Sequence, residues 1–129
     1  MSSPQIKGYE MLWRLGEGGM GAVYLARQLS LNRMVAVKIL PAGLADNPAY
    51  IMRFRQEAKA AAQLKHNNLV QIYDAGMDDG TFYFVMEYID GETAGRRVNR
   101  KGRLEEDTTL LIAESVAVAL EYAWNNAQL

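Results

Sequence analysis

The stretch "LGEGGMGAVYLA", residues 15–26, places four glycines at positions 16, 18, 19 and 21, directly before branched and aromatic residues. The segments on either side, "YEMLWRL" (residues 9–15) and "AVYLARQ" (residues 22–28), are rich in residues that favour β-strands. A hairpin turn needs fewer glycines than this, and each glycine adds conformational entropy to the unfolded chain. The pattern therefore predicts two strands joined by a turn whose bare backbone approaches a ligand.

Gly16, Gly18 and Gly21 form a G-x-G-x-x-G pattern, which two unrelated nucleotide-binding folds use. In the dinucleotide-binding fold the third glycine opens a helix, and an acidic residue follows about twenty positions later. Here a strand-like segment follows, and "LPAG" (residues 40–43) carries no acid. We therefore favour a strand–turn–strand flap whose N–H groups donate to phosphate oxygens, with Val23 covering the base of a nucleotide.

The segments that follow predict the rest of an α+β fold. "MVAVKIL" (residues 34–40) reads as a third strand, and a helix capped by Asn47 extends to about Lys65. "LVQIYDAG" (residues 69–76) and "TFYFVMEYI" (residues 81–89) read as two more strands, joined by a turn containing Asp-Gly. Because short turns join neighbouring strands, we expect a five-stranded, largely antiparallel sheet with one main helix.

Two helices are expected after the sheet. About two turns of helix follow Thr93, and a long helix runs from Glu105 to Ala127. The long helix is apolar around most of its circumference, which is more than one face of a small sheet can cover. We therefore expect the chain to self-associate through the helix over 105–127, as dimers or larger species.

The charged side chains of Lys38 and Glu57 are each expected to have a partner of opposite charge. Lys38 interrupts an otherwise apolar strand beside Ala36, whose small side chain leaves room for a flat adenine. On the helix, Glu57 leans toward the side of Phe54 and Ala61, which points to the protein interior. A surface pair within the helix would contribute only about 0.3–0.5 kcal/mol. We prefer a partly buried Lys38–Glu57 pair, in which loss of one partner would cost about 3–5 kcal/mol.

Composition narrows the classes of function. The 129 residues have a net charge of −1, no cysteine and one histidine. These values give no electrostatic case for nucleic acid binding, and they exclude thiolate and His-based metal clusters. The N-terminus lacks the pattern of a signal peptide, so we expect a cytoplasmic protein without a metal site in this segment.

Together these motifs resemble those of the bacterial branch of eukaryotic-like (Hanks-type) serine/threonine protein kinases. The glycine-rich turn resembles the ATP-covering loop, and "VAVKIL" (residues 35–40) resembles the strand with the phosphate-binding lysine. "RFRQEAKAAAQLKHNNLVQIYD" (residues 53–74) resembles the regulatory helix and the fourth strand. "FVMEYIDGET" (residues 84–93) resembles the fifth strand and hinge. The resemblance implies a small kinase lobe over 9–90, preceded by a tail over 1–8.

The resemblance also implies the residues that contact ATP. Lys38 would hold the α- and β-phosphates, Glu57 would position Lys38, Met86 would be the gatekeeper, and Glu92 would reach the ribose. The complete set of expected ATP-binding residues is Leu15, Gly16, Glu17, Gly18, Gly19, Met20, Gly21, Ala22, Val23, Ala36, Lys38, Met86, Glu87, Ile89 and Glu92. His66 falls where the family has a histidine that ties the helix end to the sheet, which favours a structural role.

The catalytic motifs of the family are absent from this sequence. Residues 91–129 resemble the start of the large lobe and stop before the H-R-D-L-x-x-x-N loop and D-F-G, so the chain holds no catalytic aspartate or magnesium ligands. Trp124 stands where the family commonly has histidine. The resemblance implies that the parent protein uses ATP and Mg²⁺ to phosphorylate a protein substrate bound through the missing part of the large lobe. The alternative is a non-catalytic, kinase-like binding or dimerisation module, and the sequence leaves open whether a later segment anchors the parent protein to a membrane.

Overall fold

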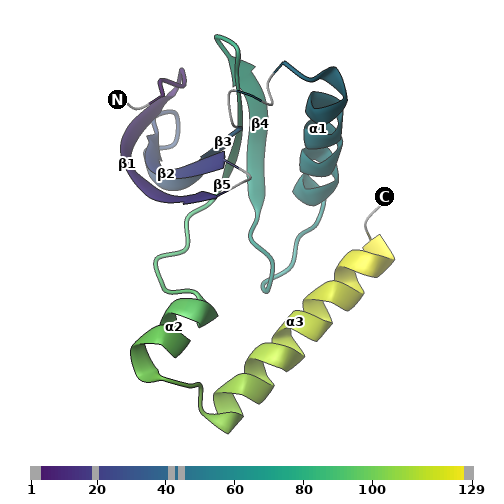
Figure 1. The fold of residues 1–129 in the computed structure, drawn as a ribbon. Helices are drawn as coiled ribbons and strands as arrows, with labels where there is room; N and C mark the ends of the chain where they lie inside the picture. Colours follow the sequence, from purple (N-terminus) through teal and green to yellow (C-terminus); the bar gives the residue numbers. More distant parts are fainter. Residues whose placement is uncertain (1–3, 19–20, 41–42, 44–45, 127–129) are drawn as a thin grey trace.

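A computed structural model describes residues 4–18, 21–40, 43 and 46–126 (Figure 1). The described chain contains a five-stranded sheet whose paired strands are all antiparallel, in the order β1-β2-β3-β5-β4. The elements are β1 (Tyr9–Gly18), β2 (Gly21–Gln28), β3 (Arg33–Ile39), α1 (Pro48–Ala62), β4 (Ile72–Asp78), β5 (Thr81–Glu87), α2 (Ala94–Lys101) and α3 (Glu106–Asn126). This confirms the predicted α+β fold, with α1 ending three residues earlier and β4 beginning three residues later than the sequence indicated.

Alternating side chains divide the apolar core between the two faces of the sheet. On one face Ala26, Val35, Val37 and Val85 are fully buried and pack against the Tyr9 and Tyr83 rings, among others. On the other face Leu40, Phe54 and Phe82 form a second cluster beneath α1. The face that contains Lys38 and Leu40 is thus the one that α1 covers.

Helix α1 begins at the predicted cap. The Oδ1 atom of Asn47 accepts hydrogen bonds from the N–H groups of Ala49 and Tyr50, at 3.1 and 3.3 Å. Pro48 takes the first helical position, where no N–H is required. The helix buries Phe54 and Ala58, and the Phe54 ring lies flat on the Phe84 ring of β5, with 4.0 Å between centroids and 4° between planes.

The β4–β5 hairpin has the tight turn that the Asp-Gly step predicted. Asp79 and Gly80 have φ values of 50° and 79°, which is the left-handed backbone that two-residue hairpin turns require. Further along this hairpin, Gly76 makes room for Tyr83. A Cβ atom at Gly76 would lie 2.9 Å from the Tyr83 hydroxyl oxygen, so the ring occupies space that only glycine leaves free.

The expected tail over 1–8 is partly folded onto the sheet. Ile6 is only 2% exposed and forms a bridge with Tyr9. The Lys7 N–H donates to the Asp78 carboxylate at 2.6 Å. Residues 4–8 therefore do not form a free tail, because an apolar side chain and a backbone hydrogen bond anchor them.

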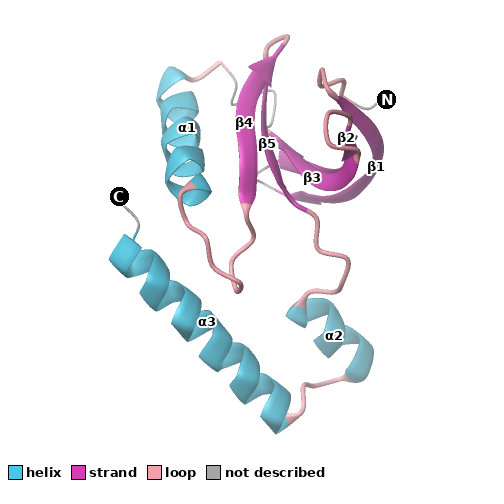
Figure 2. Cartoon of the chain, turned by 180° about the vertical axis from the view of Figure 1, so that it is seen from behind, coloured by secondary structure: helices cyan, strands magenta, loops and turns pink. Residues whose placement is uncertain are grey.

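Helices α2 and α3 lie beyond the end of the sheet and are linked by a short turn (Figure 2). Thr93 caps α2 by accepting the Arg96 N–H at 3.1 Å, and Gly102 ends it with a φ of 89°. Of α3, only Ala119 is buried, whereas Leu110, Leu111, Leu120 and Trp124 are more than 60% exposed. The prediction that the sheet does not cover this helix is confirmed.

Side chains of α3 hold the loop between α1 and β4. The Lys65 N–H donates to the Tyr122 hydroxyl oxygen at 3.0 Å, and the His66 and Tyr122 rings are 5.1 Å apart. The Asn68 side-chain amide donates to the Ser115 carbonyl at 3.1 Å. His66 itself accepts the Asn68 N–H at Nδ1, so it has the structural role that the sequence favoured.

Candidate nucleotide site

Strand register brings four of the expected ATP-binding residues to one face of the sheet. Lys38 lies opposite Val23 on β2, and Ala36 lies opposite Met86 on β5. Residues directly opposite each other in an antiparallel pair share a face, and positions two apart along a strand share it too. Val23, Ala36, Lys38 and Met86 therefore line a single surface, with a small side chain at its centre.

The glycine-rich segment forms the end of the β1–β2 hairpin beside this surface. Gly16 pairs with Val23, and Gly18 pairs with Gly21, whose φ is 110°. A Cβ atom built at Gly16 would meet nothing within 4 Å, so the backbone there borders open space rather than packed protein. Leu15, Glu17 and Ala22 belong to the same paired strands, whereas Gly19 and Met20 lie outside the described residues.

Lys38 and Glu57 face a common cavity, but the expected buried pair is not formed. The cavity has a volume of about 150 Å³ and is also lined by Tyr50, Phe54 and Phe84. Lys38 is half-buried, and Glu57 is exposed. Among the described residues, no ion pair within 4.0 Å joins these two side chains. The predicted burial was wrong, because a position on the sheet-facing side of a helix gives the direction of a side chain and not its depth.

The end of β5 and the segment after it contain two more of the expected ATP-binding residues, Glu87 and Ile89. The Glu87 N–H donates to the Gln71 carbonyl at 2.8 Å, and the Gln71 N–H donates to the Glu87 carboxylate at 3.1 Å. The Ile89 carbonyl accepts the Gly91 N–H at 3.1 Å. The Ile89 N–H has no hydrogen-bond partner within the described part of the chain, and is therefore open to a ligand acceptor.

Glu92 forms an ion pair with Arg100, a contact that the sequence did not predict. Arg100 of α2 donates to the Glu92 carboxylate from Nε at 3.3 Å and from Nη2 at 2.5 Å. These hydrogen bonds lower the pKa of Glu92 below its ordinary value, with smaller contributions from the charges of Arg100, Arg97 and Lys101. The eight-residue separation of the two side chains spans a loop and a helix, so no local spacing rule signals the contact.

The described residues contain no group of three or more histidine, aspartate or glutamate side chains that could hold a metal ion. No helix within the described ranges is both long and apolar enough to cross a membrane.

A family model described as "Protein kinase domain" matches residues 9–128. The chain belongs to this family. It is 42% identical over 118 residues to the serine/threonine-protein kinase PrkC of Bacillus subtilis, covering 92% of this chain and 18% of that protein. It is 40% identical over 122 residues to the serine/threonine-protein kinase PknB of Mycobacterium leprae, covering 92% and 20% respectively.

Solved kinase structures share the fold. The crystal structure of the Mycobacterium tuberculosis PknI kinase domain superimposes with a TM-score of 0.81 at 31% identity, over 95% of this chain and 50% of that one. The chain therefore corresponds to the small lobe and the start of the large lobe of a serine/threonine protein kinase. It spans about a fifth of the length of the curated relatives named above.

The exposed apolar face of α3 has to be considered together with the length of a whole kinase domain. The aligned part makes up 50% of the PknI kinase domain chain, so that structure contains further kinase chain with no counterpart among these 129 residues. The exposure of apolar side chains on α3 does not by itself support self-association through the 105–127 helix, which stays a prediction.

Proposed function

We propose that this chain is the ATP-binding part of a serine/threonine protein kinase, with a small lobe over 9–90 and the start of the large lobe over 91–129. The complete protein would transfer the γ-phosphoryl group of ATP to a serine or threonine hydroxyl of a protein substrate. The observation that carries the proposal is the cross-strand register that aligns Val23, Ala36, Lys38 and Met86 on one face.

The residues on this face fit the chemistry of ATP. Ala36 and Met86 offer a flat apolar surface for adenine, and Val23, on the same face, would cover the base. Glu87 and Ile89 would contact the adenine edge through their backbone groups. Lys38 supplies a cation for the α- and β-phosphates, next to the hairpin in which the backbone at Gly16 borders open space. Glu92 would accept a ribose hydroxyl.

The segment alone is expected to be inactive. Phosphoryl transfer in this family uses Mg²⁺ to neutralise charge on the phosphates, together with an aspartate that orients the hydroxyl. The motifs that carry these residues do not occur in the 129-residue sequence. In the complete protein, Glu57 would position Lys38 after a shift of α1, since the two side chains already face one cavity.

The test is the affinity of the chain for ATP after Lys38→Met. A charge-assisted hydrogen bond contributes about 1.5–3 kcal/mol, so we expect ATP to bind about 10–100-fold more weakly, as measured by isothermal titration calorimetry. The free energy of unfolding should change little, because Lys38 is not part of an ion pair with Glu57. Lys59→Met on the exposed side of α1 is the matched control and should bind ATP normally. Unchanged ATP affinity in Lys38→Met would contradict the proposed nucleotide site.

A further inference from the structure

Positive charge is concentrated on α2 and the turn that follows it. Five of the eight residues from position 96 to 103 are basic, although the whole chain has a net charge of −1. These residues are Arg96, Arg97, Arg100, Lys101 and Arg103. Within the part of the chain that the structure describes, only Arg100 has a carboxylate partner, which is Glu92. The other four cations have no carboxylate within 4.0 Å in this part of the chain; Arg96, Lys101 and Arg103 are exposed, and Arg97 is half-buried.

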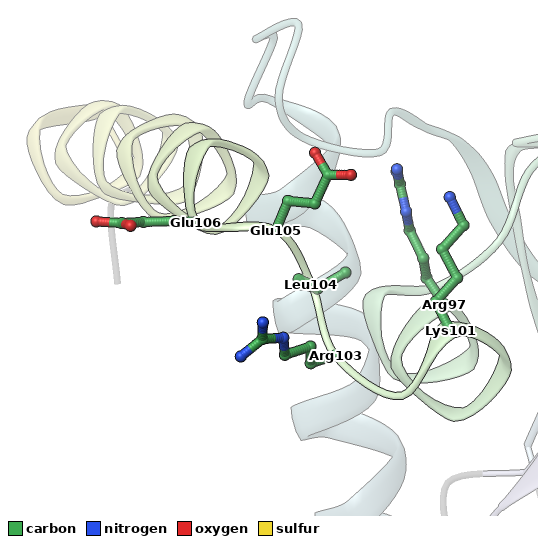
Figure 3. A pocket seen from close by; sticks show the side chains of 6 residues that line it. All are labelled: Arg97, Lys101, Arg103, Leu104, Glu105 and Glu106. Atoms are coloured by element: carbon green, nitrogen blue, oxygen red, sulfur yellow. The ribbon is translucent and has the colours of Figure 1, made fainter.

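A cavity of about 710 Å³ lies between α2 and the start of α3 and is lined by part of this cluster. Figure 3 shows Arg97 and Lys101 extending side by side from one face of α2, as expected for positions four apart on a helix. Glu105 extends toward the same side from the linker, whereas Arg103 and Glu106 point away from this pair. Leu104 adds an apolar side chain to the lining.

The basic pair is held on a well-capped helix. Thr93 fixes the first turn of α2, and the Gly102 N–H closes the last turn by donating to the Val98 carbonyl at 2.7 Å. The Glu92–Arg100 ion pair also joins the segment before the helix to its last turn. Because the backbone is fixed at both ends, a ligand pays little to order the helix when it binds to Arg97 and Lys101.

We propose that the cavity between α2 and α3 docks an acidic segment of a protein partner. Carboxylates of the segment would bind Arg97 and Lys101, an apolar side chain would contact Leu104, and a basic group following the acidic ones would bind Glu105. The cavity would bind this segment whether or not the chain binds ATP. That the partner is a substrate of the kinase rests on the proposed function.

The mixed lining favours a peptide over a continuous polyanion. Glu105 and Glu106 line the same cavity as the cations, so they would repel a uniformly negative phosphate backbone or a membrane surface. A peptide can instead alternate its charges and match both signs. Charge complementarity of this kind selects a partner more than it strengthens binding.

The experiment measures fluorescence anisotropy of a labelled peptide in which three glutamates precede a leucine and a lysine, added to the 129-residue chain. A peptide with glutamines in place of the glutamates is the reference ligand. We expect the acidic peptide alone to bind, and Arg97→Glu/Lys101→Glu to raise its Kd by about tenfold. Lys59→Glu/Lys65→Glu, which changes the net charge by the same amount at exposed positions of α1 and of the loop after it, should leave the Kd unchanged.

Glu105→Ala separates a peptide from a polyanion. It should weaken binding of the lysine-containing acidic peptide, whereas a polyanion site would bind more tightly once the repelling carboxylate is removed. A short DNA duplex and phosphatidylserine vesicles serve as competitors. The proposal is overturned if neither peptide binds, if both variants with reversed charges lose binding equally, or if DNA or vesicles displace the peptide at lower concentration than unlabelled peptide does. None of these results depends on ATP, so they leave the nucleotide site untouched.

Discussion

At the scale of single residues, two hydrogen bonds from Arg100 fix the carboxylate of Glu92 at the edge of the proposed ribose site. The hydrogen bonds favour the ionised carboxylate, which is why the pKa of Glu92 lies below its ordinary value. A carboxyl group with a lowered pKa in the folded state stabilises the fold above its unfolded pKa. That contribution is lost as the pH falls through the folded pKa.

Arg100→Ala should therefore raise the pKa of Glu92 back toward 4.5, the ordinary value for this side chain. The measurement is a titration of the side-chain carboxyl carbon by NMR. Arg103→Ala is the matched control, because Arg103 forms no hydrogen bond with Glu92 and is not among the charges that shift its pKa. An unchanged titration in Arg100→Ala would show that the two side chains are not paired in solution.

At the scale of an element, the start of α1 depends on one side chain. Asn47 satisfies two of the N–H groups that a helix leaves without partners in its first turn. Asn47→Ala should lower the free energy of unfolding by about 1 kcal/mol, measured by urea denaturation. Asn47→Asp keeps the acceptor and adds a negative charge at the helix N-terminus, so it should retain the stability of the original protein. Equal losses in both variants would argue against capping as the cause.

The elements also show what the sequence could predict. The cap at Asn47, the hairpin turn at Asp79 and Gly80, and the shared face of Ala36 and Lys38 all follow from local periodicity or backbone preference. The separation of Lys38 from Glu57 and the contact between Glu92 and Arg100 do not. Each depends on where a helix sits relative to the sheet or to a neighbouring loop, which side-chain periodicity does not specify.

At the scale of the whole molecule, α3 is tied to the small lobe through the loop between α1 and β4. Tyr122→Phe removes the oxygen that accepts the Lys65 N–H but keeps the ring that lies beside His66. The net loss of one hydrogen bond, about 1 kcal/mol, should speed exchange of the Lys65 amide hydrogen about fivefold. Tyr88→Phe, whose hydroxyl contacts Asp90, should leave that amide unaffected. An unchanged exchange rate in Tyr122→Phe would mean that this tie does not hold the loop.

The flat contact between the rings of Phe54 and Phe84 has a mechanical consequence. Two parallel rings in face-to-face contact lose much of their dispersion energy when pulled apart but little when one slides across the other. This contact therefore opposes lifting of the helix more than sliding of it across the sheet, and Leu40 and Phe82, which pack with Phe54, add to the resistance. Glu57 lies three residues beyond Phe54 and would move with the helix. We therefore expect Glu57 to approach Lys38 by sliding at this contact, which would keep the two rings stacked.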